Sequence, residues 1–153
     1  MNRAGSQDSM LVKSYVLLPL ILSAFERDSI IISAHIRTPA PYLDMLKTAS
    51  AQAAGDLRDV RHEMRKRGIK VYEQERLQKG IEARFICRGY HDRMLLLNDI
   101  LAAQAAIHMR RYLGIDITAF RSFEEQYRLI PETTGAQDTG SSAQAKNRSY
   151  LWE

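Results

Sequence analysis

The chain has 153 residues, of which 45% are hydrophobic and 26% are charged, and its formal net charge is +4. These values describe one globular domain with room for one core, and they exclude a chain that is disordered throughout. The lone cysteine, Cys87, excludes an internal disulfide and a zinc site built from cysteines, which favours a reducing cytoplasm.

The first predicted element is a helix that follows a flexible N-terminus, residues 1–9, and runs to about Ser33. Its apolar residues recur at steps of three and four, and Pro19 lies inside the pattern, which predicts a kink. The apolar run from Ser14 to Phe25 is shorter than the roughly 20 residues that cross a bilayer. No A-x-A cleavage pattern follows it, so we expect neither a transmembrane segment nor a signal peptide.

A second helix is predicted from Pro41 to Arg67, because Pro suits the first turn of a helix and Gly68 suits the position after its end. Small residues in the middle of this helix predict close approach of a neighbouring helix. The apolar seam follows a heptad pattern and consists of Leu43, Leu46, Ser50, Ala53, Leu57, Val60 and Met64.

After Gly68 the apolar period changes from that of a helix to that of a strand. Ile69–Arg76 and Ile81–Arg88 predict a two-stranded hairpin around the turn Leu77-Gln78-Lys79-Gly80. A third, strongly apolar helix is predicted from Asp92 or Arg93 to Leu113, before Gly114.

These elements predict an α+β fold that is mainly helical, namely an antiparallel three-helix bundle with the hairpin 69–88 between helices two and three. The domain spans 10–130, with a short further helix at Ser122–Leu129, and the polar stretch 131–153 predicts a disordered tail. The helices offer more apolar surface than a three-helix core needs, which predicts a homodimer through helix one or three.

The positive charge is concentrated in residues 58–93, which hold 11 of the 22 Lys and Arg against six Asp and Glu. This stretch carries +5 and the rest of the chain −1, which predicts one basic surface on helix two and the hairpin. The candidate binding residues are Arg58, Arg61, Arg65, Lys66, Lys70, Arg84 and Arg88.

Three interpretations of this surface stay open. It can bind an acidic protein or an anionic membrane surface, or it can neutralise the phosphates of a nucleic acid. It can also be a solvated face, because cations near the end of a helix complement its dipole and cations on a hairpin block edge pairing.

No catalytic motif is present in the sequence. His62-Glu63 begins like the helix motif of zinc proteases, but Lys66 occupies the position of the second His. Cys87 alternates inward with Phe85 in the predicted strand, which indicates a buried residue rather than a reactive thiol. We therefore expect no catalytic residue, cofactor or metal, and the remaining histidines show no metal-site spacing: His35, His91 and His108.

Four phrases of the sequence resemble the YhjD-like family of small proteins from spore-forming Firmicutes: VLLPLILSAFERD, PYLDMLKTA, RKRGIKVYEQER and CRGYHDR. The resemblance covers Tyr15–Leu113 and implies a bacterial, cytoplasmic protein. It implies no activity, cofactor or catalytic residue. The leading hypothesis is a non-enzymatic interaction or regulatory module that uses the basic face, and the alternative is a nucleic-acid-binding protein that uses the same face.

Overall fold

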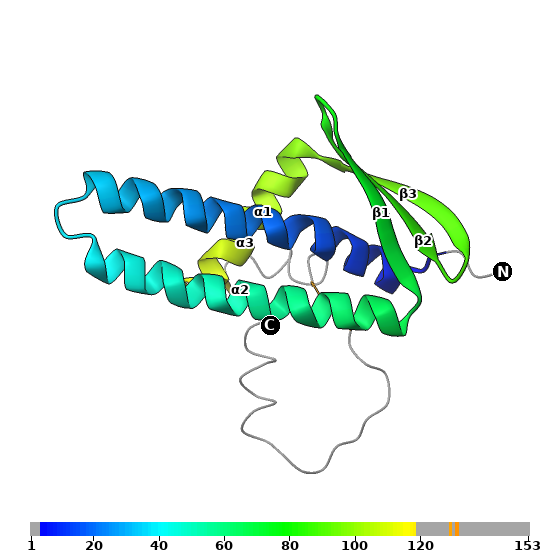
Figure 1. Ribbon diagram of the computed structural model, residues 1–153, viewed down its shortest axis with the longest axis horizontal. Coiled ribbons are helices and arrows are strands. Elements are labelled where there is room, and N and C mark those ends of the chain that lie inside the picture. Colours follow the sequence, from blue (N-terminus) through cyan, green and yellow to red (C-terminus); the bar gives the residue numbers. More distant parts are fainter. Residues whose placement is uncertain (1–3, 119–128, 130, 132–153) are drawn as a thin grey trace, which may run out of the picture.

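The structure, a computed structural model, describes residues 4–118 together with Leu129 and Pro131. In chain order its elements are α1 (Ser6–His35), α2 (Ala40–Lys66), β1 (Ile69–Arg76), β2 (Gly80–Cys87), β3 (Tyr90–Leu97) and α3 (Asn98–Tyr112). The helices α1 and α2 form a long antiparallel hairpin, and α3 crosses it (Figure 1). The sheet lies at the end of the hairpin where α1 begins and α2 ends.

The helix α1 starts at Ser6, inside the segment that we predicted to be flexible, and continues through Pro19. The early start is explained by Asp8, which is 5% exposed and accepts a hydrogen bond from the backbone N–H of Gly5 at 3.0 Å. A carboxylate in the first turn satisfies a free donor there and complements the helix dipole.

The apolar seam predicted for α2 faces α1. Most of its members are buried, and Ala49 and Ala53 are fully buried where the two helices run side by side. Leu43 and Ser50 are only half-buried. The helix ends one residue early, at Lys66, and Gly68 takes a positive φ of 67°, as expected of a glycine after a helix.

The predicted α+β class is confirmed, and the hairpin predicted at 69–88 is present as β1 and β2. The prediction of only two strands is wrong, because the sheet has three antiparallel strands in the order β1-β2-β3. The third strand occupies Tyr90–Leu97, where we predicted the start of helix three, and α3 begins only at Asn98. The chain turns between β2 and β3 at Arg88 and Gly89, whose φ angles are 49° and 88°. Two successive left-handed residues are typical of a tight hairpin turn.

The apolar run Met94–Leu97 caused this error, since a short apolar run fits a buried strand or a helix equally well. In the structure Leu96 is buried whereas Leu95 and Leu97 are about 40% exposed, which is the alternation of a strand. Gly80, predicted to be a turn residue, opens β2 instead, and a Cβ there would lie 2.1 Å from the carbonyl oxygen of Leu96.

One continuous core joins the helical hairpin to the inner face of the sheet, where Ala83, Phe85 and Cys87 of β2 are buried. The helix α3 buries one face only and crosses α1 and α2, so the predicted antiparallel bundle is wrong in its third helix. Two polar residues of α3, Gln104 and His108, point inward, since they are 1% and 3% exposed.

Two predicted features of the C-terminal region, the helix at Ser122–Leu129 and the tail 131–153, lie largely outside the described residues. Leu129 itself is buried, and its carbonyl oxygen accepts a hydrogen bond from Ser14 Oγ at 2.6 Å. This contact joins Leu129 to the N-terminal half of α1.

Candidate functional site

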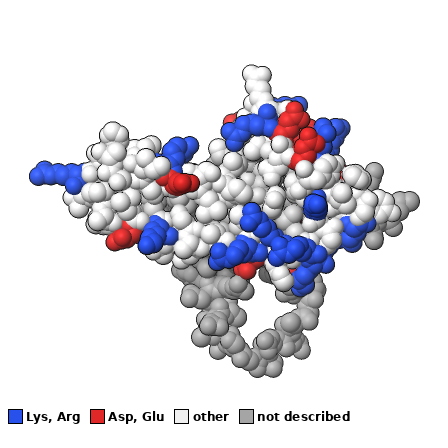
Figure 2. Space-filling view, viewed as in Figure 1, with Lys and Arg blue, Asp and Glu red and all other residues white. Residues whose placement is uncertain are grey.

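The C-terminal half of α2 carries a row of three exposed arginines, Arg58, Arg61 and Arg65, which we call the α2 arginine row. The spacing of three and four residues places the three side chains on one side of the helix. Lys and Arg gather over this half of α2 in the space-filling view (Figure 2). Within the described part of the chain, no carboxylate forms an ion pair with any of the three.

One arginine of the row is supported by an aromatic ring. The guanidinium carbon of Arg61 lies 5.8 Å from the centre of the Tyr15 ring, which belongs to α1. A guanidinium over a ring face is attracted by the ring and loses part of its freedom, while its charge stays available to an anion. The contact with Tyr15 therefore partly orders the central arginine of the row.

The two lysines of the predicted site lie on either side of the end of α2. Lys66 Nζ lies 3.7 Å from Glu63 Oε2, so its charge is partly compensated. Lys70, in β1, is exposed and makes no ion pair with a described residue. The hydrogen bond from Arg67, followed by the charges of Lys66 and other cations, lowers the pKa of Glu63 despite its partial burial.

Arg84 lies on the outer face of the sheet, between two carboxylates. Its Nε donates to Glu82 Oε1 at 3.2 Å and its Nη1 to Glu73 Oε2 at 3.3 Å. Positive and negative side chains are intermixed over the sheet, in contrast to the surface over α2 (Figure 2). The structure thus divides the predicted basic surface into a cationic helix and a charge-balanced sheet.

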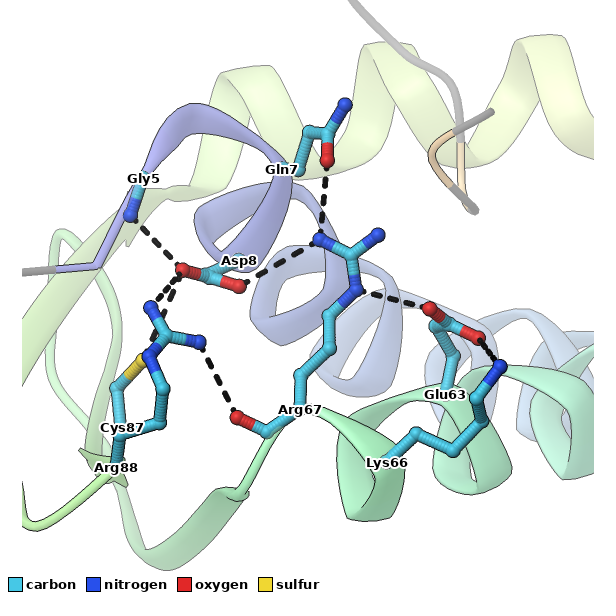
Figure 3. A network of polar contacts seen from close by, with 8 residues as sticks. All are labelled: Gly5, Gln7, Asp8, Glu63, Lys66, Arg67, Cys87 and Arg88. Atoms are coloured by element: carbon cyan, nitrogen blue, oxygen red, sulfur yellow. Dashed lines mark hydrogen bonds and ion pairs between the residues drawn. The ribbon is translucent and has the colours of Figure 1, made fainter. Parts of the chain in front are cut away.

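Arg88 belongs to a polar network that holds three chain segments together (Figure 3). Its Nη2 donates to Asp8 Oδ2 at 2.8 Å and its Nη1 to the carbonyl oxygen of Arg67 at 3.2 Å. Arg67 in turn lies 3.7 Å from Asp8 Oδ1 and donates to Glu63 at 2.9 Å. The network joins the start of α1, the end of α2 and the end of β2. We predicted from the sequence that Arg88 binds a partner, but these contacts favour a structural role for this residue.

The electrostatics of Asp8 agree with this structural role. Burial acts to raise the pKa of this carboxyl, but hydrogen bonds from Arg88 and the Gly5 N–H and the charges of two arginines outweigh burial, so the pKa is lowered. Cys87 is buried beside the network, with its Sγ 3.7 Å from Asp8 Oδ2. Burial and the neighbouring carboxylate raise the pKa of the thiol, which makes it a weaker nucleophile at neutral pH.

A shallow, open depression on the outer face of the sheet was not found by sequence reasoning. It is lined by Tyr72, Arg84, His91, Asp92 and Arg93. Tyr72 sits at an irregularity between Val71 and Glu73, where β1 has one residue more than β2. The Tyr72 ring meets the His91 ring edge to face, with ring centres 5.6 Å apart.

The four histidines are dispersed over the molecule. His35 ends α1, His62 is exposed on α2, His91 is exposed on β3, and His108 is buried in α3. Among the residues that the structure describes, no three His, Cys, Asp or Glu side chains come close enough to hold a metal ion. In the same part of the chain, no helix is sufficiently long and apolar to span a bilayer.

A buried polar pair joins α2 to α3, and sequence reasoning missed it. Tyr112 Oη donates to Asp56 Oδ2 at 2.6 Å, and both residues are buried. Burial, with the negative charge of Asp56, raises the pKa of Tyr112 far above its usual value. Asp56 is next to Leu57, a member of the heptad seam of α2. This position was the only feature of the sequence that could have indicated its burial.

Comparison with known proteins places the chain in a family. The family model described as "YhjD protein" matches residues 3–117. The chain belongs to the YhjD family. It is 28% identical over 104 residues to the protein titled "Uncharacterized protein YhjD" of Bacillus subtilis (strain 168), an alignment covering 67% of this chain and 87% of that protein. No solved structure matches the chain.

Proposed function

We propose that this protein is a non-enzymatic interaction module, bacterial and cytoplasmic, that binds an acidic protein partner through the α2 arginine row. The observation that carries the proposal is the difference between the cations of the predicted site. Arg84 and Arg88 are engaged by carboxylates of the fold, and Lys66 is partly so. The arginine row and Lys70 are exposed, and no described carboxylate pairs with them.

The shape of the row suits a carboxylate-bearing partner. Three guanidiniums on one side of a straight helix span roughly 10 Å, since each residue rises about 1.5 Å. Arginine binds carboxylates with two parallel hydrogen bonds, so an acidic helix or extended acidic segment can engage successive members of the row. Tyr15 holds the central guanidinium in place, which reduces the entropy lost on binding.

The second candidate is a nucleic-acid-binding protein that uses the same side of the molecule. The observation in its favour is the depression on the sheet, where Tyr72 and His91 present aromatic rings beside Arg84 and Arg93. Aromatic rings next to arginines are the usual means by which a protein stacks the bases of a single strand. In this arrangement the arginine row would contact phosphates.

A titration with short fluorescent probes separates the two candidates. The probes are an oligo-glutamate peptide, a random single-stranded RNA and a random DNA duplex, each measured by anisotropy at about 50 and about 200 mM salt. An interaction module binds the peptide at least as tightly as the nucleic acids. The nucleic-acid candidate requires tighter RNA binding that weakens when Tyr72 and His91 are replaced by Ala. Failure of all three probes at low salt would refute both.

The decisive variant replaces Arg58, Arg61 and Arg65 with Ala. Its matched control replaces three cations from the other end of the helical hairpin, Arg27, Arg37 and Lys47, which changes the net charge by the same amount. We expect the row variant to lose at least tenfold in peptide affinity and the control to keep the affinity of the unmodified protein. Equal losses in both variants would show that only net charge matters.

A further inference from the structure

The closed end of the α1–α2 hairpin exposes large apolar side chains. We define the distal end as residues 26–48, which project beyond α3 and the sheet (Figure 1). Of the 11 large hydrophobic residues that are exposed in the described part of the chain, five lie between positions 30 and 45. They are Ile30 (65% exposed), Ile31 (50%), Ile36 (45%), Tyr42 (53%) and Met45 (51%).

The exposure has a structural cause. Phe25 is the last buried residue of α1 and Leu46 is the first buried residue of α2. The helix α3 and the sheet lie toward the other end of the hairpin (Figure 1). At the distal end, the described part of the chain consists of two helices that lie side by side. A helix pair buries one stripe on each member and needs a further layer to bury more. The distal end is therefore half of a helical bundle.

The charge of the distal end differs from that of the arginine row. Residues 26–48 contain Glu26, Arg27, Asp28, Arg37, Asp44 and Lys47, three of each sign. An acidic or basic partner gains no net electrostatic attraction from such a surface. Two copies of it do not repel each other, and charges of both signs can pair across a two-fold axis.

The area of the patch approaches what a dimer needs. Half-exposed side chains of this size offer roughly 100 Å² each, so five of them offer about 500 Å². This is more than half of the roughly 800 Å² that each partner contributes to a stable interface. Exposed apolar area of this extent on a small protein favours a contact site.

We propose that a second copy of this chain docks on the distal end, so that two α1–α2 hairpins form a four-helix contact around a two-fold axis. The proposal deepens the homodimer expected through helix one or three: helix one takes part together with α2, and α3 does not. It does not depend on the arginine row, which lies on the other half of α2. The protein then presents two arginine rows, one at each outer end of the dimer.

Sedimentation equilibrium of the full chain at about 5–50 µM tests this interface. We expect a mass twice the 17.5 kDa of the chain. The variant Ile30→Gln, Tyr42→Gln, Met45→Gln should be a monomer with an unchanged circular dichroism spectrum. Leu95→Gln, which alters an exposed apolar residue of the sheet, should remain a dimer. An unmodified chain that sediments as a monomer, or a triple variant that remains a dimer, would refute the interface.

A measurement on the unmodified chain covers the case in which the variant fails to fold. Amide hydrogen exchange in residues 26–48 should slow by at least fivefold between about 0.5 and about 50 µM protein, whereas exchange in β1–β3 should not change. Exchange that is independent of concentration at the distal end would overturn the proposal. So would slowing that requires anionic lipid vesicles, because the occupant would then be a membrane surface.

Discussion

The two halves of the α1–α2 hairpin are made of the same two helices but have opposite surroundings. The proximal half packs against α3 and the sheet, and it carries the arginine row and the Asp8 network. Among the described residues, the distal half consists of α1 and α2 alone and exposes apolar side chains among balanced charges. One pair of helices thus provides a buried core at one end, and our two proposals assign a separate contact surface to each end.

The largest effect expected from this comparison concerns the core of the proximal half. Phe85→Ala removes a side chain that is 1% exposed and lies between the sheet and the helices, so we expect a loss of about 3–5 kcal/mol in unfolding free energy. Ile30→Ala, at the distal end, should change the stability of the monomer by less than about 0.5 kcal/mol. Urea denaturation of both variants in dilute solution measures the contrast, and equal losses would contradict it.

The Asp8 network should contribute the next largest effect. Asp8→Asn leaves Arg88 without its carboxylate and should cost about 2 kcal/mol at pH 7, whereas Asp44→Asn, on the exposed distal surface, should cost almost nothing.

The cost of Asp8→Asn should depend on pH. The pKa of Asp8 is lowered in the folded state, so its contribution is fully present above the usual carboxyl pKa of 3.8 and is lost as the pH falls through the lower folded value. The stability difference between the two proteins should therefore persist at pH 5 and shrink below pH 3.8. A difference that grows on acidification would contradict the assignment.

A smaller effect is expected where α3 crosses the proximal half. Tyr112→Phe removes the hydroxyl that donates to buried Asp56 and should reduce the unfolding free energy by about 1–2 kcal/mol. The matched control is Tyr90→Phe, which alters an exposed tyrosine at the start of β3. Thermal unfolding of the two variants at pH 7 checks the prediction. Equal melting temperatures would show that the buried pair adds nothing.

The smallest effect on stability should come from the arginine row itself. Because no described carboxylate pairs with Arg58, Arg61 or Arg65, their joint replacement by Ala should change the unfolding free energy by no more than about 0.5 kcal/mol. Arg88→Ala should reduce the melting temperature clearly, since its partner Asp8 is buried. A row variant as unstable as Arg88→Ala would assign the row a structural role.

The sequence was sufficient for the helical hairpin and insufficient for the sheet. A heptad seam ended by Gly68 defines α2 because local periodicity and a terminating glycine agree. The strand β3 pairs with β2 across the tight turn at Arg88 and Gly89, and the polar residues Asn98 and Asp99 separate its apolar run from α3. These local signals were present, but the short apolar run Met94–Leu97 fits a helix as well as a strand.

The sequence was sufficient to list the cations of the candidate site, but not to tell which of them form ion pairs with carboxylates of the fold. In the sequence, Arg58 and Arg88 look alike, because both belong to the same basic stretch. Only the fold brings Asp8, which is 80 residues away in the sequence, into contact with Arg88. The depression around Tyr72 and His91 was equally hidden, since it depends on an extra residue in β1 that the pattern of side chains does not reveal.

The most direct test of the account is to measure mass and peptide binding on the same two variants. With a peptide too short to span two copies, Ile30→Gln, Tyr42→Gln, Met45→Gln should be a monomer with unchanged affinity. Arg58→Ala, Arg61→Ala, Arg65→Ala should be a dimer that has lost at least tenfold in affinity. Loss of both properties in either folded variant would contradict the claim that the two ends of α2 make separate contacts.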